Sequence, residues 1–233
     1  MNPGQVPVIA ADQPLFAMVK QIQWQWPDSY GESQFVIMFG GLHIEMAALR
    51  SLGTLLDGSG WVATLEDAGI PSANSFQVAS NVNKTLHAHH MTACVLYKLM
   101  KQAFSENPND TGFDEWIDQR AGYSPHFAFW NMVLDMQLTI FLLVRSFREA
   151  DFKLYCEALY KLIPYFFANN NNNYARWIPI HLNDMMSLDQ KHPDIAHNLR
   201  LGHFTINKTC RSFSALQIDH AHEQNNSVIK GDG

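Results

Sequence analysis

The pattern of apolar and polar positions changes along the chain, and its first part predicts two strands, each followed by a helix. A short apolar run at residues 6–11 ends at Asp12 and has the length and composition of a strand. A second run, at residues 35–39, is ended by a pair of glycines, Gly40 and Gly41. Helical spacing follows at 14–24 and at 42–56, and residues 27–32 are expected to form a loop.

The middle of the chain, residues 61–201, has helical periodicity almost throughout. Its main interruptions are the segment 107–112 (Asn-Pro-Asn-Asp-Thr-Gly) and the asparagine run 169–173, both typical of turns. The predicted helices cover 61–68, 75–104, 113–120, 125–149, 151–168, 174–188 and a segment that Pro193 opens.

Strand-like alternation returns near the end of the chain, at 204–209 and 212–218, before a last predicted helix at 219–230. The sequence therefore predicts an α/β fold in which helix predominates. Strands at both ends form a core, and a large all-helical block is inserted between them. We expect a single domain in three segments, 1–60, 61–201 and 202–233.

Composition narrows the class of protein. The chain has 233 residues, of which 47% are hydrophobic and 16% charged, so it can bury a sizeable core and global disorder is excluded. Its formal net charge is −6, whereas a non-specific DNA-binding protein normally has an excess of basic residues. We therefore do not expect the chain by itself to bind nucleic acid.

Three widely separated cysteines favour an intracellular protein without disulfides, because they form no CxxC pair and no even-numbered framework. The N-terminus lacks the basic and apolar regions of a secretory signal. The longest apolar stretch, 127–144, is interrupted by Asn131, Asp135 and Gln137. A buried helix is the better interpretation of this stretch than a membrane span, since an aspartate in lipid is costly.

Polar residues that can bind metal follow three of the predicted strands. Asp12 follows the first, His43 and Glu45 follow the second, and Asp219, His220, His222 and Glu223 follow the last. Carboxylates at strand ends are typical ligands of magnesium and manganese. Each residue also has a simpler interpretation, because Asp12, His43 and Asp219 are all candidates for capping a nearby helix.

A second group of candidates lies within the predicted helices. His87, His89 and His90 are close in sequence, and His181 and Asp184 are three residues apart, so they could form an all-helical metal site. No i, i+4 histidine pair is present, and a polar helix face with one satisfied core histidine is the favoured interpretation. The aromatic residues of this block are expected to pack between helices.

Three segments resemble a multi-copy family of uncharacterised animal proteins that look like products of mobile genetic elements. They are Phe-Gly-Gly-Leu-His-Ile-Glu-Met at 39–46, Tyr-Ala-Arg-Trp-Ile-Pro-Ile-His-Leu at 174–182 and Ile-Asp-His-Ala-His-Glu-Gln-Asn-Asn at 218–226. The organisation is also distantly similar to ribonuclease-H-like transposase cores of the hAT type. In those proteins a helical block separates the acidic residues that hold the metals.

This resemblance implies a metal site of Asp12, His43, Asp219 and Glu223, with Asp12, Asp219 and Glu223 as the catalytic carboxylates. One position departs from the related pattern Gly-Asp-x-His, because the aspartate position is Gly41 here. Either His43 or Glu45 then replaces the missing ligand, or the centre is degraded. The family looks longer at both ends, so the chain is expected to be a fragment without its DNA-binding module.

The expected function is that of a transposon-derived protein with a degraded metal-dependent nuclease or transposase-like domain. Magnesium or manganese would be its cofactor if it is active, and nucleic acid its partner only with additional segments. The alternative is a catalytically inactive helical interaction or scaffold protein. Membrane association is not expected, and the nucleus is favoured over the cytoplasm.

Overall fold

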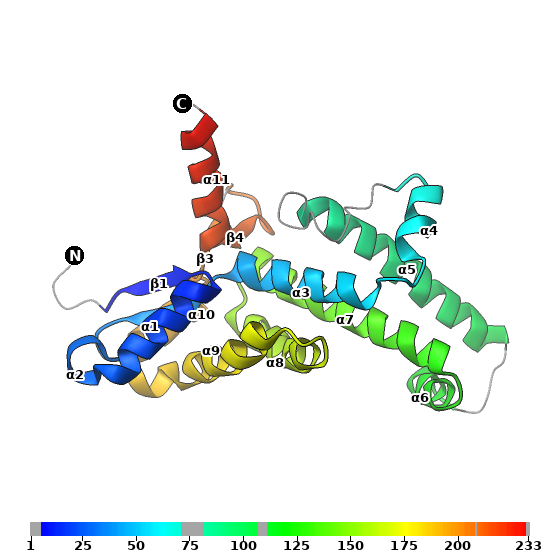
Figure 1. The fold of residues 1–233 in the computed structure, drawn as a ribbon, viewed down its shortest axis with the longest axis horizontal. Coiled ribbons are helices and arrows are strands. Elements are labelled where there is room, and N and C mark those ends of the chain that lie inside the picture. The colour runs from blue at the N-terminus through cyan, green and yellow to red at the C-terminus, as the bar shows by residue number, and fades with distance from the viewer. Residues whose placement is uncertain (1–5, 71–81, 107–110, 208, 232–233) are drawn as a thin grey trace. The chain divides into compact units, whose positions relative to one another are not determined.

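The computed structural model describes residues 6–70, 82–106, 111–207 and 209–231, with side chains up to residue 226, and helices dominate it (Figure 1). The chain divides into two compact units. The first unit combines residues 1–47 with 142–233, and the second is residues 48–141. The expected predominance of helix, with short strands near both ends, is confirmed.

The first unit begins with a parallel pair of strands, β1 (Val8–Ala11) and β2 (Val36–Phe39), in which Ala11 pairs with Phe39. Every residue of β2 is buried, as a strand covered on both faces requires. Helix α1 (Gln13–Gln25) connects the two and packs on β2, with the rings of Phe16 and Phe39 4.8 Å apart. Both predicted N-terminal strands are thus confirmed.

The predicted loop at 27–32 is partly wrong, because Pro27–Tyr30 forms the short helix α2. Proline is well tolerated at the first helical position, where its missing N–H has no partner to lose. Helix α3 (Gly41–Leu55) then starts directly after β2, and the boundary between the two units falls within it.

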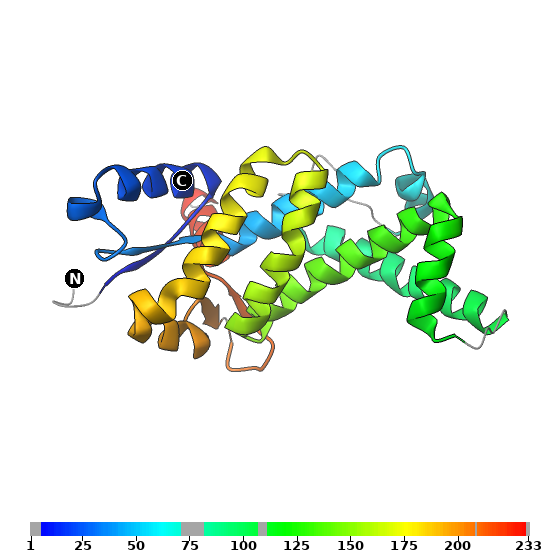
Figure 2. The same cartoon turned by 90° about the horizontal axis from the view of Figure 1, so that it is seen from below.

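Three helices, α8 (Phe152–Ala168), α9 (Asn172–Lys191) and α10 (Pro193–Arg200), complete the helical part of the first unit. Helices α8 and α9 run side by side, as Figures 1 and 2 both show. The asparagine run between them forms the expected turn, in which Asn170 has a positive φ of 52°. Asparagine tolerates this conformation better than most residues.

The C-terminal strands are shorter than predicted. β3 (Thr205–Asn207) and β4 (Ala215–Gln217) form an antiparallel pair, and α11 (Ile218–Gly231) follows β4 without a break. Among the described residues, the four strands form two separate two-stranded sheets. The strands at the two chain ends therefore do not pair with each other here.

The second unit consists of the end of α3, α4 (Trp61–Asp67), α5 (Val82–Glu106), α6 (Phe113–Tyr123) and most of α7 (Pro125–Arg148). Residues 75–81 of one predicted helix, and most of the predicted break at 107–112, lie outside the described residues. Ala93, Met100 and Leu134 form an apolar cluster between α5 and α7. Trp116 packs against Phe104, Phe113 and Phe127, so these aromatic residues pack between helices as expected.

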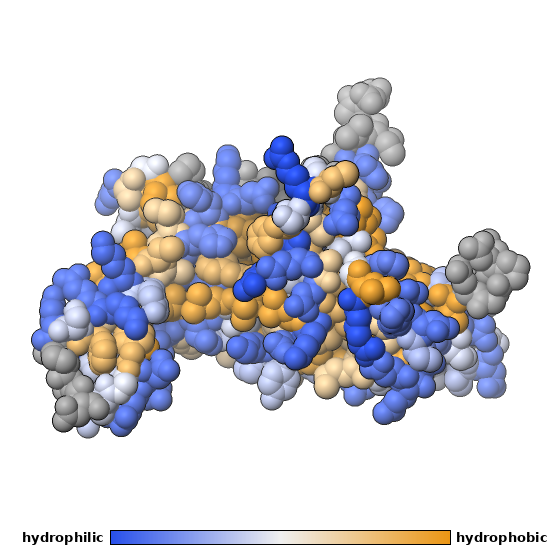
Figure 3. Space-filling model, turned by 180° about the vertical axis from the view of Figure 1, so that it is seen from behind, coloured by the Kyte–Doolittle hydropathy of each residue, from blue (hydrophilic) through white to orange (hydrophobic). Residues whose placement is uncertain are grey.

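Helix α7 is the one described helix that is long and apolar enough to cross a membrane by length and composition. Core helices of soluble proteins pass the same test, and Val133, Met136 and Ile140 of α7 are fully buried. Exposed apolar side chains elsewhere appear as orange areas among hydrophilic blue residues in Figure 3.

Candidate functional site

The start of α3 receives a carboxylate from the distant C-terminal segment. Asp219 lies in the first turn of α11 and is buried. Its Oδ2 atom accepts hydrogen bonds from the backbone N–H groups of Leu42, at 3.0 Å, and His43, at 3.3 Å, while Oδ1 lies 3.2 Å from the Leu42 nitrogen. A carboxylate here neutralises the partial positive charge of the free N–H groups at the helix start.

Glycine at position 40 is needed for this approach. A Cβ atom there would lie 2.5 Å from Asp219 Oδ2, closer than side-chain carbon atoms come, and a tight 3.0 Å from the carbonyl oxygen of Ala11. The Gly40 N–H also donates to that Ala11 carbonyl at 2.7 Å, which extends the ladder between β1 and β2. The double glycine thus lets α11 and both strands meet at the start of α3.

His43 pairs with the same carboxylate through its ring. His43 Nδ1 lies 3.0 Å from Asp219 Oδ2, and its side chain is a quarter exposed. The hydrogen bond to Asp219 raises the pKa of His43 above its ordinary value of 6.5, although partial burial opposes the shift. Nε2 has no hydrogen-bond partner within the described part of the chain. A histidine oriented by a carboxylate at one nitrogen presents the other to a ligand.

Asp12 and Glu223 are close enough to His43 for their charges to raise its pKa as well. Asp12 follows β1, one residue beyond the Ala11–Phe39 pair, and it is exposed, as is Glu223 on α11. The fold therefore brings all four predicted site residues into one neighbourhood of the first unit, although at least 176 residues separate Asp12 and His43 from Asp219 and Glu223.

Of the three predicted helix-capping residues, only Asp12 caps the helix that directly follows it. Asp12 caps α1, since its Oδ1 accepts from the Leu15 N–H at 3.1 Å. The idea that Asp219 caps its own helix is wrong, because α11 begins at Ile218 and Asp219 caps α3 instead. His43 does not cap α3 either, since it is the third residue of that helix.

The residue types around His43 fit a divalent cation, but their arrangement is incomplete. His43 Nε2 and the exposed carboxylates of Asp12 and Glu223 are ligand types that manganese accepts. Both oxygens of Asp219 already accept backbone hydrogen bonds, so this residue orients His43 more readily than it binds a metal. Among the described residues, no group of three or more His, Cys, Asp or Glu side chains is arranged to hold a metal ion.

Gly41, which stands where the related pattern has an aspartate, faces closely packed side chains. A Cβ atom at this position would clash with the ring of Phe147 and lie 2.8 Å from Gln217 Cγ. The surroundings therefore have no room for a carboxylate at position 41.

Glu45 is a second buried carboxyl group beside this site. It is 4% exposed, and Gln217 Nε2 donates to its Oε2 at 2.6 Å. Burial raises the pKa of Glu45 to about 7, and the charge of Asp219 adds to the shift. The sequence predicts Glu45 only as a replacement ligand, because its position on α3 does not indicate that Gln217 and Asp219 lie near it.

The helical histidines do not form the alternative metal site within one unit. His87 and His90 belong to the second unit, whereas His181 and Asp184 belong to the first. His181 is fully buried and lies 2.7 Å from the Tyr155 hydroxyl, and burial lowers its pKa to about 3. Asp184 pairs with Lys20 at 2.9 Å. His181 and Asp184 therefore pair with Tyr155 and Lys20, respectively, and not with each other.

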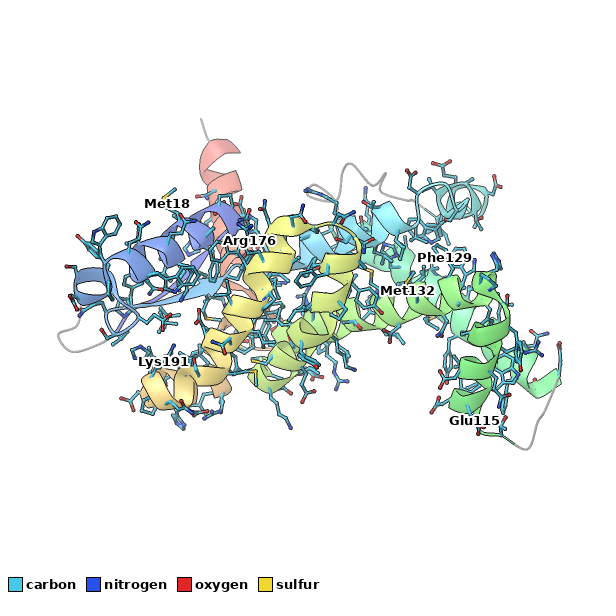
Figure 4. The ribbon with its side chains drawn as sticks, turned by 60° about the horizontal axis from the view of Figure 1, so that its bottom comes forward. Met18, Glu115, Phe129, Met132, Arg176 and Lys191 are labelled. Carbon is cyan, nitrogen blue, oxygen red and sulfur yellow. The ribbon has the colours of Figure 1, made fainter. Side chains whose placement is uncertain are left out.

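A buried lysine forms an ion-pair network that the sequence pattern did not indicate. Lys20 on α1 is 1% exposed, and its Nζ atom lies 2.6 Å from Glu32 Oε1 as well as near Asp184. Lys191, labelled in Figure 4 near the end of α9, reaches the other oxygen of Glu32 at 2.6 Å. The spacing of Phe16, Lys20 and Gln23 was the available signal, because all three lie on the buried face of α1.

The first unit thus defines a helix-rich α/β protein with a histidine–aspartate pair at a strand end. The chain belongs to the family described as "Domain of unknown function (DUF8702)", which matches residues 3–112 and 109–233. No curated protein and no solved structure matches the chain.

Proposed function

We propose that the chain carries the degenerate centre of a metal-dependent nuclease or transposase-like domain that originated in a mobile genetic element. The observation that carries this proposal is the His43–Asp219 pair at 3.0 Å, with the exposed carboxylates of Asp12 and Glu223 nearby and no partner for His43 Nε2 among the described residues. The reaction class is attack of water or a hydroxyl group on a phosphodiester. A ribonuclease-H-like arrangement of the strands is part of the same proposal.

Each residue has a distinct role in this proposal. His43 Nε2 and the carboxylates of Asp12 and Glu223 would hold manganese or magnesium, and the ion would stabilise the negative oxygens around phosphorus. Asp219 is a positioning residue, because it fixes the ring of His43 through Nδ1 and caps α3 with the same carboxylate. Glu45 lies behind this layer and is closed off from solvent.

Nucleic acid is the proposed substrate, with additional segments supplying most of the binding. The net charge of −6 gives the chain no general attraction for phosphates. A bound divalent cation would offset part of the acidic character around Asp12 and Glu223. The nucleus is the compartment that fits such a substrate.

The test is calorimetric titration of the intact chain with manganese chloride, together with cleavage of a labelled single-stranded DNA. Asp12→Asn is the informative variant, because asparagine keeps the cap on α1 while removing the charge. We expect it to weaken manganese binding by about tenfold. Asp219→Asn should weaken binding by about 10- to 100-fold, as loss of an orienting partner does.

Asp151→Asn is the matched control for Asp12→Asn. Asp151 is also an exposed aspartate that caps a helix, α8, through a 2.9 Å bond from the Leu154 N–H. Manganese binding should be unchanged in this variant. Binding that is equally strong in the wild type and in Asp12→Asn would contradict the proposed site.

The second candidate function is a catalytically inactive interaction or scaffold protein of the same origin. It is favoured by the packing of Phe147 and Gln217 against Gly41, which leaves no space for the missing carboxylate. On this alternative His43 and Asp219 serve stability alone. Absence of both manganese binding and cleavage in the wild type would favour the scaffold.

A further inference from the structure

The second unit contains a hollow that the proposed nuclease centre does not use. It measures about 350 Å³ and is bounded by the end of α3, the turn at 57–60, α4 and the first part of α5, elements that can be followed in Figure 1. Its size is within the range of small-molecule sites in proteins. All of its lining residues belong to the second unit.

A buried histidine forms the polar part of the lining. His89 on α5 is 1% exposed, and its ring stacks on that of Trp61, with ring centroids 4.7 Å apart and planes 9° from parallel. Gln137 Nε2 lies 3.1 Å from His89 Nδ1, which holds the ring through one nitrogen. For the other nitrogen, Nε2, the described residues provide no hydrogen-bond partner. This nitrogen is therefore available to a ligand in the hollow that pairs with it.

The remaining lining determines the charge and shape of the ligand. Leu49, Leu56 and Val62 give the hollow an apolar wall, and the acids Asp57 and Glu66 lie at its exposed side. None of the described lining residues is a lysine or an arginine. His89 adds no positive charge, because burial lowers its pKa to about 4. The site therefore favours a cation and disfavours a carboxylate.

We propose that this hollow binds a small organic amine with an apolar or aromatic body and a hydroxyl-type polar group. The ammonium group lies toward Asp57 and Glu66, the body lies against the apolar wall, and the hydroxyl pairs with His89 Nε2. Because the Gln137 amide nitrogen donates to Nδ1, the proton of the neutral His89 ring is on Nε2, and the ligand hydroxyl accepts a hydrogen bond from it.

The experiment uses two probes of similar shape and opposite charge, tyramine and 3-(4-hydroxyphenyl)propionate, titrated calorimetrically into the intact chain. We expect tyramine to bind and the carboxylate to bind at least about tenfold more weakly. The double variant Asp57→Asn/Glu66→Gln should remove most of this preference. His89→Phe, which keeps an aromatic ring against Trp61, should weaken tyramine binding by a similar factor.

His90→Phe is the control, because His90 is the next residue on α5 and stacks on Phe141 instead of lining the hollow. It should bind tyramine as the wild type does. Absence of tyramine binding, equal binding of the two probes, or unchanged binding in the Asp57/Glu66 variant would overturn the proposal. The acid variants decide the outcome even if His89→Phe does not fold, and none of these results depends on the nuclease proposal.

Discussion

Asp219 Oδ2 lies 3.0 Å from His43 Nδ1 although 176 residues separate the two along the chain. The same carboxylate accepts from two backbone N–H groups at the start of α3. The Asp219 side chain therefore accepts hydrogen bonds from the free N–H groups at the start of α3 and also orients the imidazole ring of His43. The structure of the first unit and its proposed chemistry depend on the same atoms.

Asp219→Ala should destabilise the protein by about 1–2 kcal/mol, since it leaves the start of α3 without its cap. Asp219→Asn keeps an acceptor oxygen and should cost less. Urea denaturation followed by circular dichroism measures both changes. Asp151→Ala, which removes the cap of α8, provides the scale for loss of a local cap. A smaller loss for Asp219→Ala than for Asp151→Ala would contradict the importance of the distant contact.

The His43–Asp219 pair also predicts a dependence of stability on pH. The folded protein raises the pKa of His43, so the stabilisation is fully present below the ordinary value of 6.5. It is lost as the pH rises from 6.5 through the higher pKa of the folded state. Denaturation at several pH values between 6 and 9 should show this decline in the wild type. His43→Gln should remove that part of the decline.

Glu45→Gln should stabilise the protein above neutral pH. The pKa of Glu45 is about 7 in the folded protein and 4.5 ordinarily, so folding favours its neutral form. The wild type therefore loses stability as the pH rises from 4.5 to about 7, by about 3 kcal/mol for a shift of this size. Glutamine avoids the charge and should flatten this slope in chemical denaturation. Glu115→Gln, on the surface of α6, should leave the slope unchanged (Figure 4).

Lys20→Met should cost about 3–5 kcal/mol of stability, because it leaves Glu32 and Asp184 facing each other without the buried cation. Lys191→Met is the matched comparison, since Lys191 contacts the same Glu32 but is 43% exposed, and it should cost less than about 1 kcal/mol. Equal losses in thermal or urea denaturation would show that burial of Lys20 is not the deciding factor.

Low pH should also weaken the ion pairs that Glu32 forms with Lys20 and Lys191. Burial alone raises the pKa of Glu32, but the hydrogen bonds from Lys191 and Lys20 outweigh it and hold the pKa below 4.5. The stabilisation is therefore present above pH 4.5 and is lost as the pH falls through the lower pKa of the folded state. Lys20→Met should reduce the acid sensitivity measured between pH 5 and 3.

Gly41→Asp, which restores the acid of the related pattern, should destabilise the protein without creating nuclease activity. Overpacking of this kind costs about 1–3 kcal/mol, and here the new side chain meets Phe147 and Gln217. Gly122→Ala is the control, since nothing lies within 4 Å of a Cβ atom there. It should be neutral or slightly stabilising in the same melting experiment. A stable Gly41→Asp variant that binds manganese more tightly than the wild type and cleaves DNA would contradict the degraded centre.

The sequence predicted the strands and most helices because their apolar spacing is local. Both strands of the first pair, for example, are apolar runs ended by Asp12 or glycine. The prediction missed α2 because its first residue, Pro27, and the Gly31 that follows it are both typical of loops. The predicted C-terminal strands were also longer than the paired segments of β3 and β4. Alternation of apolar and polar residues does not by itself decide which backbone groups form hydrogen bonds between strands.

The sequence did not indicate the contacts that the residues of the candidate site make. Asp12, His43, Asp219 and Glu223 meet in one neighbourhood, yet nothing local in the sequence indicates that Asp219 caps α3 rather than α11. Lys20 was overlooked because a single lysine in a helix is usually exposed, and only its position four residues after Phe16 places it on the buried face. In both cases the deciding partner is far away in the sequence: Leu42 for Asp219, and Asp184 for Lys20.

The cap that Asp219 provides has a consequence for the order of synthesis. A ribosome adds roughly 5–20 residues per second, so residue 219 follows Leu42 by on the order of 10 to 35 s. Until then the start of α3 lacks the Asp219 carboxylate, and β1 lacks its contact with α11. The first strands therefore reach their final surroundings only after residue 219 has been synthesised.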